Sequence, residues 1–233
     1  MKEIAERKFL SLFDDKGASA FSDLRFERCV FTNCVLADTK DPSKRSHVRN
    51  VQLVDCSEVG CSVGPAVLED VVIDGLKTSD LFIIWGALFR HVMLRGRVGS
   101  IKINALPDID ESKPDLVAPF QRARDEFYRK TDWSIDISDA IVSSFDATGI
   151  PARLFRRDPL SQAVVRRKNV EGAAWRKRVA RGNPWMDIID VVFEDDPPED
   201  TVLVAPKAAR KAKFQAMVDG LANLRDAGVA DRD

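Results

Sequence analysis

The sequence predicts a mainly β protein with helices, in which a short parallel β-solenoid of about four coils is followed by a C-terminal α+β extension. Three observations lead to this prediction. Apolar residues in one part of the chain recur at a shift of 20 positions, the preceding part matches the same set at a shift of 27, and the apolar residues follow an inner period of five. Self-similarity at a fixed period is typical of architectures in which stacked units bury one another's apolar faces.

The repeat covers residues 21–106 and can be aligned position by position. At the shift of 20, six apolar residues of one unit fall on six of the next: Val48, Val51, Leu53, Cys56, Cys61 and Val63 on Leu68, Val71, Ile73, Leu76, Leu81 and Ile83. At the shift of 27, the preceding unit contributes Phe21, Leu24, Phe26, Cys29, Cys34 and Leu36. The seven extra residues lie within residues 37–47, so we expect an inserted loop at one corner.

The six aligned positions reduce to two places in the five-residue period, a central position and the position two before it. Of the twelve central positions in residues 21–83, ten are apolar, and only Glu58 and Thr78 are not. Four faces of five residues then make a coil of 20. This register places Leu53 over Phe26 and under Ile73, about 4.8 Å apart. Replacing Leu53 by Asp is therefore predicted to prevent folding, because it buries an unpaired charge.

Several pairs combine a small residue with a large central residue two positions later: Cys29 with Phe31, Cys34 with Leu36, Cys61 with Val63 and Ala66 with Leu68. This pattern resembles the pentapeptide-repeat family, and the resemblance covers about residues 21–106. It implies a right-handed parallel β-helix with a square coil. The family usually has Asp or Asn just before the central residue, where this chain has Val30, Val35, Ser62 and Val67, so a triangular or irregular coil stays open.

After residue 83 two side-chain registers are possible. One points Leu88, His91, Met93, Val98, Ile101 and Ile103 inward, and the other points Phe89, Val92 and Leu94 inward and His91 outward. A slip of one residue inverts every side chain of a strand. Because burying His91 without a partner would cost free energy, we expect a local bulge or corner that absorbs the slip.

Four segments are expected along the chain. Residues 1–20 form an N-terminal cap over the open strand edges, and residues 21–107 form the solenoid. Residues 108–150 comprise a helix over residues 114–130, capped by Ser112 or Asp115, and a return strand that packs on the solenoid. Residues 151–233 form the α+β part.

Within this last segment, turn residues 158–161 predict a hairpin between residues 153–157 and 163–168. Residues 170–181 are expected to be helical, and residues 201–205 to form a short strand. The apolar stripe of residues 207–227 predicts the last helix, which ends before Gly228.

Composition and charge limit the class of protein. The chain has 233 residues, 45% of them hydrophobic and 31% charged, with a formal net charge of −1. It lacks an apolar run of about 18 residues and a signal-peptide pattern, so we expect a cytoplasmic protein with no membrane partner. The four cysteines follow the spacing C-x4-C-x21-C-x4-C, and stacking in the repeat favours core packing over a zinc site.

Catalytic motifs are sparse. The chain has two histidines, His47 and His91, and no nucleophile elbow, Gly-rich phosphate loop or H-E-x-x-H motif. We therefore assign no catalytic, cofactor-binding or metal-binding residue. One alternative is a carbohydrate-active β-helix enzyme, with the carboxylates of Asp70, Asp74 and Asp80 beside the aromatic residues Phe82, Trp85 and Phe89, although solvated acids explain these aspartates more simply.

A basic stretch over residues 152–182 is the strongest functional signal. Its possible binding surface consists of Arg153, Arg156, Arg157, Arg166, Arg167, Lys168, Trp175, Arg176, Lys177, Arg178 and Arg181. Such a face could bind phosphates, which makes a nucleic-acid-binding accessory protein the first alternative. Residues 187–200 carry seven acids and no base, so the two stretches could instead pair within the fold.

The sequence favours a non-catalytic protein-binding or scaffold protein whose partner is another protein. Bacterial proteins that share this kind of repeat are often protein-binding, and the resemblance therefore includes immunity-type and inhibitor proteins. Candidate contact residues are the inserted loop, residues 38–47, and the basic stretch.

Overall fold

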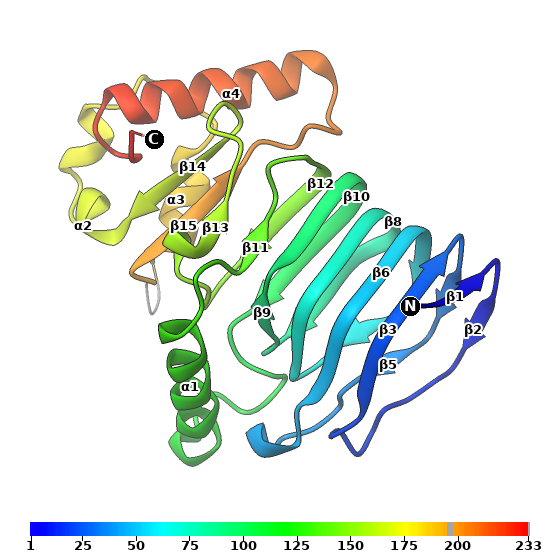
Figure 1. Ribbon diagram of the computed structural model, residues 1–233. Coiled ribbons are helices and arrows are strands. Elements are labelled where there is room, and N and C mark those ends of the chain that lie inside the picture. The colour runs from blue at the N-terminus through cyan, green and yellow to red at the C-terminus, as the bar shows by residue number, and fades with distance from the viewer. Residues whose placement is uncertain (195–197, 233) are drawn as a thin grey trace.

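The structure is a computed structural model that describes residues 1–194 and 198–232. The described chain is mainly β, with a 13-stranded parallel sheet, a two-stranded antiparallel sheet and four α-helices (Figure 1). The strands of the large sheet are β1 (Lys2–Ala5), β2 (Lys8–Leu10), β3 (Ala20–Glu27), β4 (Val30–Thr32), β5 (Val35–Leu36), β6 (Ser46–Val59), β7 (Ser62–Val63), β8 (Ala66–Trp85), β9 (Leu88–Arg90), β10 (Val92–Asn104), β11 (Ile135–Asp136), β12 (Ala140–Ala147) and β13 (Phe155–Arg156).

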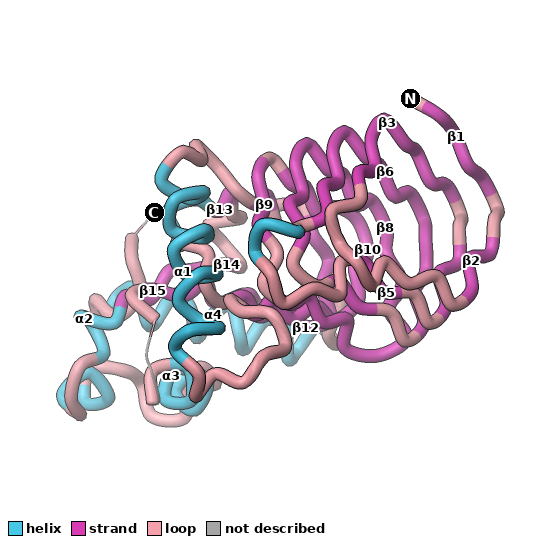
Figure 2. The backbone as a smooth tube through the Cα atoms, turned by 90° about the horizontal axis from the view of Figure 1, so that it is seen from below, coloured by secondary structure: helices cyan, strands magenta, loops and turns pink. Residues whose placement is uncertain are grey.

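The pairing register follows the two shifts seen in the sequence. Strand β3 pairs with β6 at a shift of 27, so that Phe26 lies beside Leu53. Strand β6 pairs with β8 at a shift of 20, so that Leu53 lies beside Ile73. The predicted stacking of these three residues is confirmed, and Figure 2 shows the successive parallel strands side by side.

Sharp bends divide the long strands at intervals of five residues. The bend residues have positive φ and stand at Asp23, Arg28 and Asn33, at Asn50, Asp55 and Gly60, at Asp70 and Gly75, and at His91 and Gly96. The left-handed region of backbone conformation costs least for Gly and is tolerated by Asn and Asp. Gly, Asn and Asp together account for most of these positions. The bends explain why polar residues interrupt the apolar pattern at fixed spacing.

Glu58 and Thr78, the two polar residues at central positions of the repeat, have side-chain oxygens that accept hydrogen bonds. Glu58 is buried, and its carboxylate accepts the backbone N–H groups of Cys61 and Ser79, each at 3.1 Å. The hydroxyl of Thr78 accepts the backbone N–H of Ser100 at 3.0 Å. Buried polar groups are tolerated when they are paired in this way.

The register changes after Thr78. Val63 lies beside Ile84, at a shift of 21, so the predicted alignment of Val63 with Ile83 is wrong by one residue. The pairing of β10 with β8 then shifts again on both sides of Val98. These irregularities let residues from both predicted registers point inward: Leu88, Phe89, Val92, Leu94, Val98, Ile101 and Ile103 are buried. His91 stays partly exposed at a bend.

The first residues extend the sheet, where the sequence suggested a separate cap. Strand β1 pairs in parallel with β3, and β2 pairs in parallel with β4. The rings of Phe9 and Phe31 are stacked with their centroids 5.0 Å apart, and both contact Phe26 edge to ring. Ile4 and Phe9 of the N-terminal segment thus pack on the next strands, and β1 and β2 become the end of the stack.

Helix α1 (Pro114–Arg129) follows the last long strand and lies beside the strand stack, away from β1 and β2 (Figure 2). Its N-cap residue is Lys113, and neither Ser112 nor Asp115 supplies the predicted side-chain cap. Phe120 and Tyr128 are its buried residues. Strands β11 and β12 then return and pair in parallel with β10.

The predicted hairpin in residues 153–168 is wrong. Strand β13 pairs in parallel with β11 in the large sheet, whereas β14 (Gln162–Arg166) pairs antiparallel with β15 (Asp200–Val204). The predicted helix over residues 170–181 is also wrong. Only α2 (Arg167–Val170) and a 3-10 turn at Ala174–Lys177 form there, because Gly172 has a φ of +69° that interrupts helical geometry.

The C-terminal helices complete a second core. Helices α3 (Met186–Val192) and α4 (Lys211–Asp226) pack with the two-stranded sheet, and Gly228 has a φ of +66° just after α4, as expected for a C-terminal stop. None of the helices in residues 1–194 and 198–232 is both long and apolar enough to cross a membrane.

Candidate functional site

The basic stretch lies in the C-terminal part, and most of it is on the surface. The exposed members are Arg153, Arg156, Arg166, Lys168, Arg176, Lys177, Arg178 and Arg181, and Arg157 and Arg167 are partly exposed. Trp175 is only 2% exposed and belongs to the second core. Its indole therefore stabilises the C-terminal part and is not available on the surface, which differs from the sequence-based expectation.

Several arginines of this stretch are paired with acids of the same fold. Arg166 binds Asp231 at 2.8 Å, Arg167 pairs with Glu199, and Arg176 pairs with Asp190. Glu199 and Asp190 belong to the acidic stretch of residues 187–200, so the two stretches meet within the protein. Two further acids of that stretch, Asp195 and Asp196, lie outside the described residues. Exposed ion pairs contribute little to stability, but they reduce the positive charge offered to a polyanion.

The three aspartates considered for sugar cleavage do not converge. Asp70 stands at one bend of β8, and a second bend at Gly75 separates the segment with Asp74 from the one with Asp80. The hollow beside Asp70 is lined by neither of the other two. Phe89, one of the proposed sugar-stacking aromatic residues, is buried. The structure therefore lacks the carboxylate arrangement that a glycosidase would need at these positions.

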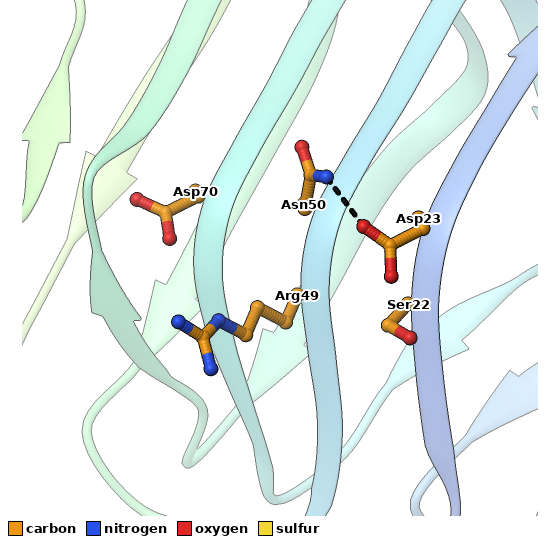
Figure 3. A pocket seen from close by; sticks show the side chains of 5 residues that line it. All are labelled: Ser22, Asp23, Arg49, Asn50 and Asp70. Carbon is orange, nitrogen blue, oxygen red and sulfur yellow. Dashed lines mark hydrogen bonds between the residues drawn. The ribbon is translucent and has the colours of Figure 1, made fainter. Parts of the chain in front are cut away.

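A row of polar residues follows one bend from strand to strand (Figure 3). It lines an open hollow of about 470 Å³ with Ser22, Asp23, Arg49, Asn50 and Asp70. The side-chain N–H of Asn50 donates to Asp23 at 2.6 Å, and this hydrogen bond lowers the pKa of Asp23. Small-molecule sites are mostly apolar, so this solvated polar row is better explained as a bend-stabilising ladder.

His91 continues this row with a carboxylate at each ring nitrogen. Nδ1 lies 3.1 Å from Asp70 and Nε2 lies 2.8 Å from Asp132, and the ring contacts that of Trp133 at 4.7 Å between centroids with a tilt of 33°. Partial burial acts to lower the pKa of His91, but the hydrogen bonds to Asp132 and Asp70 outweigh it, so the pKa is raised. Both ring nitrogens act as donors in the charged form, which leaves no lone pair for general-base catalysis.

The contribution of His91 to stability should depend on pH. Because its pKa is raised from 6.5, the charged ring stabilises the fold fully below pH 6.5, and this stabilisation is lost as the pH rises through the raised value. The pKa of Asp132 is lowered from 3.8 by its hydrogen bond to His91. The stability that the ionised Asp132 contributes is therefore lost as the pH falls through that lowered pKa. We expect His91→Gln to reduce the melting temperature most between these limits.

Melting curves of the wild-type and His91→Gln proteins, recorded from acid to alkaline pH, test this prediction. The His47→Gln protein is the matched control, since His47 is the second histidine and is exposed. A His91→Gln deficit that stayed constant from pH 5 to pH 9, or one equalled by the control, would contradict the pairing with Asp70 and Asp132.

The four cysteines are reduced thiols that pack in and beside the sheet. Cys29 and Cys56 are buried, and the backbone N–H of Cys34 donates to the sulfur of Cys61 at 3.3 Å. Burial raises the pKa of Cys56 and of Cys61, which keeps these thiols protonated and weakly reactive. In the described part of the chain, no group of three or more His, Cys, Asp or Glu side chains is arranged to hold a metal ion.

The N-terminal end of the large sheet is the most distinctive surface. Strands β1 and β2 each pair on one side only within the described chain, and they lie at the end of the stack in both views (Figures 1 and 2). Beside them, Leu10 is 68% exposed, and Leu12 and Phe13 are each 55% exposed. We call β1, β2 and residues 11–13 the open edge. An unpaired strand edge with adjacent apolar side chains is a template for another chain.

Sequence reasoning did not identify the open edge as a site, because residues 1–20 were expected to form a cap. The available signal was the apolar run at Leu10, Leu12 and Phe13, directly before the turn at residues 14–17.

No protein-family model matches the sequence, and the comparisons with curated proteins and with solved structures also give no match.

Proposed function

We propose that the protein is a non-catalytic, protein-binding scaffold of the cytoplasm whose open edge binds an extended segment of a partner protein. The exposed apolar residues Leu10, Leu12 and Phe13 beside a one-sided strand edge carry this proposal. The scaffold would be a short, right-handed parallel β-solenoid similar to the pentapeptide-repeat proteins. The pairing shifts of 27 and 20 and the bends at five-residue spacing support that interpretation.

The geometry of the edge favours a short extended partner. Strand β1 has four residues and β2 has three, and bends at Glu6 and Ser11 follow them. Unpaired backbone groups along these strands can pair with an added strand, and pockets for alternate side chains then give specificity. Residues 2–8 carry both signs of charge, at Lys2, Glu3, Glu6, Arg7 and Lys8, so the edge does not select a strongly charged partner.

Other functions receive less support. A nucleic-acid-binding surface would use the basic stretch, but Arg166, Arg167 and Arg176 already pair with acids. A sugar-cleaving enzyme would need the aspartates of β8 to converge, which they do not. Binding of another protein at the open edge uses features that are exposed and have no partner within the described chain.

The test is affinity capture from the lysate of the source cells with three tagged proteins. The wild type should retain a stoichiometric partner, and a Leu12→Lys/Phe13→Lys variant should lose it, because two charges replace the apolar contact at the edge. The control is Val191→Lys on α3. Val191 is 73% exposed, so this variant also places a charge on an exposed apolar position, and α3 lies at the other end of the molecule from β1 and β2 (Figure 1).

Captured proteins should be verified by reconstitution from purified components, and sedimentation of the free protein separates a partner from a second copy of this chain. The absence of a stoichiometric partner would contradict the proposal, and so would equal capture by the edge variant and the wild type. A homodimer that the edge substitutions dissociate would replace the partner protein by a second copy.

A further inference from the structure

The inserted loop of residues 37–47 packs against helix α1. Within it, a 3-10 turn at Pro42–Lys44 is stabilised by Asp41, whose carboxylate accepts the N–H of Ser43 at 2.9 Å, and this turn contacts α1. A hollow of about 330 Å³ lies between the two elements and the strand below. The residues that line it are Pro42, Arg45, Leu88, Arg90, Ala123, Glu126, Phe127 and Lys130.

Arg45 is an unusual member of this lining because it is a buried cation. It is only 6% exposed, and its guanidinium lies 5.3 Å from the centroid of the Phe120 ring. One terminal N–H donates to the carbonyl oxygen of Gly86. Its Nε is buried and has no hydrogen-bond partner among the described residues. No carboxylate of residues 1–194 or 198–232 forms an ion pair with it.

Within the described residues, no carboxylate therefore compensates the charge on Arg45. Burial lowers its pKa to about 10, so the side chain is still a cation at neutral pH. A buried charge that lacks a counter-ion carries a large desolvation cost, and proteins usually pair such groups. Because Arg45 lines the hollow, an anion bound there would compensate this charge.

The rest of the lining combines positive charge with apolar surface. Arg90 pairs with Glu69 at 2.8 Å and lies 4.7 Å from the ring centroid of Phe127, and its Nε is also buried without a partner in the described chain. Lys130 pairs with Glu126 at 2.9 Å. The lining holds three cations and one anion, Glu126; with Glu69, the partner of Arg90, the net charge is +1 from 3 − 2, and it belongs to Arg45. Leu88, Phe127, Ala123 and Pro42 supply the apolar walls.

We propose that this hollow binds a small organic carboxylate with an apolar body, and that Arg45 takes the carboxylate. A planar guanidinium matches the two oxygens of a carboxylate and pairs with them more strongly than with a neutral acceptor. The apolar body would contact Leu88 and Phe127. A volume near 330 Å³ lies at the lower end of the roughly 300–1,000 Å³ of small-molecule sites, which limits the ligand to a short chain or a single ring. The site is separate from the open edge and does not depend on it.

Isothermal titration of the full-length protein tests this proposal with defined probes. Phenylacetate and octanoate should bind at pH 7. Phenylacetamide, which lacks the charge, and acetate, which lacks the apolar body, should each bind at least about tenfold more weakly. The Arg45→Met protein should lose at least about tenfold in affinity for phenylacetate, because the buried charge is removed while the side-chain volume is largely kept.

Three further measurements separate ligand binding from a structural role of Arg45. The melting temperature of Arg45→Met without ligand should stay close to that of the wild type, because the removed desolvation cost of the buried cation offsets the loss of its hydrogen bond to Gly86. Ala123→Trp should fill the hollow and abolish binding with every charge intact. Arg122→Met removes an exposed charge from the same helix outside the lining, and it should bind phenylacetate like the wild type.

The proposal would be overturned if neither carboxylate bound the wild-type protein, or if phenylacetamide bound as tightly as phenylacetate. Unchanged binding by Ala123→Trp would also overturn it. This last variant keeps the test decisive even if Arg45→Met does not fold.

Discussion

The Leu76→Asp protein is expected to be unfolded under conditions in which the wild type is folded. Leu76 is 3% exposed and lies between Cys56 and Val98 on the two neighbouring strands. The residues paired with it on either side, Cys56 and Val98, offer a carboxylate no cation, so burying it costs roughly 4 kcal/mol or more. That cost is comparable to the total stability of a typical domain, about 5–15 kcal/mol. Far-ultraviolet circular dichroism and denaturant titration measure the effect.

Leu53→Asp is the matched comparison, because Leu53 is on the adjacent strand but is only partly buried. Its charge can reach solvent, so we expect destabilisation without complete loss of folding, a smaller effect than the sequence alone predicts. A Leu76→Asp protein with a cooperative transition close to that of the wild type would show that the interior between β6, β8 and β10 is not closed.

The Gly99→Ala protein is expected to lose about 3 kcal/mol of unfolding free energy. A Cβ atom at Gly99 would lie 1.9 Å from the hydroxyl oxygen of Thr78 and 2.8 Å from its Cβ. Thr78 cannot move freely, because its hydroxyl also accepts the N–H of Ser100 at 3.0 Å. The two strands must therefore separate locally and give up part of their pairing. Urea-induced unfolding at neutral pH measures the loss.

Removing the opposing side chain should relieve the clash. In a Thr78→Gly background, Gly99→Ala should cost much less than in the wild type, so the two substitutions are strongly non-additive. Gly60→Ala is the control for backbone strain alone, because a Cβ there meets nothing within 4 Å although φ is +62°. Additive effects of the two substitutions would refute close strand approach as the cause.

The sequence predicted the repetitive part of the fold well for a physical reason. Each apolar residue of β6 pairs with a residue of β8 at the same shift. Stacked strands therefore need apolar residues at equivalent positions, and the same pattern recurs along the sequence. The single-residue slip near Ile83 was outside that pattern. It accompanies the hydrogen bond in which the side chain of Glu58 accepts the N–H of Ser79, which no local periodicity encodes.

The C-terminal part was predicted less well because its strands pair with distant partners. Val164 of β14 lies beside Val202 of β15, and Phe155 of β13 lies beside Ile135 of β11. A turn at residues 158–161 therefore looks like a hairpin from the sequence although it connects two different sheets. By contrast, α4 has a regular apolar stripe and a glycine stop, and it was found within four residues at its start and one at its end.

Neither candidate site could be derived from local sequence. Arg45 becomes a buried cation only because α1, which begins 69 residues later at Pro114, contacts the loop that contains it. The open edge depends on β1 and β2 having no strand on their outer side within the described chain. Trp175, which was grouped with the basic residues, is drawn into a core made by residues far along the chain.

The seven-residue difference between the two pairing shifts has an evolutionary consequence. The seven additional residues lie between β5 and β6. Strand β3 still pairs with β6 at one constant shift. A duplicated unit could thus acquire new chemistry through one short insertion, with no change to the residues that hold the strands together. Selection could then vary the segment around Arg45 independently of the scaffold, and related chains of different ligand preference would be expected to differ first in the length and composition of this segment.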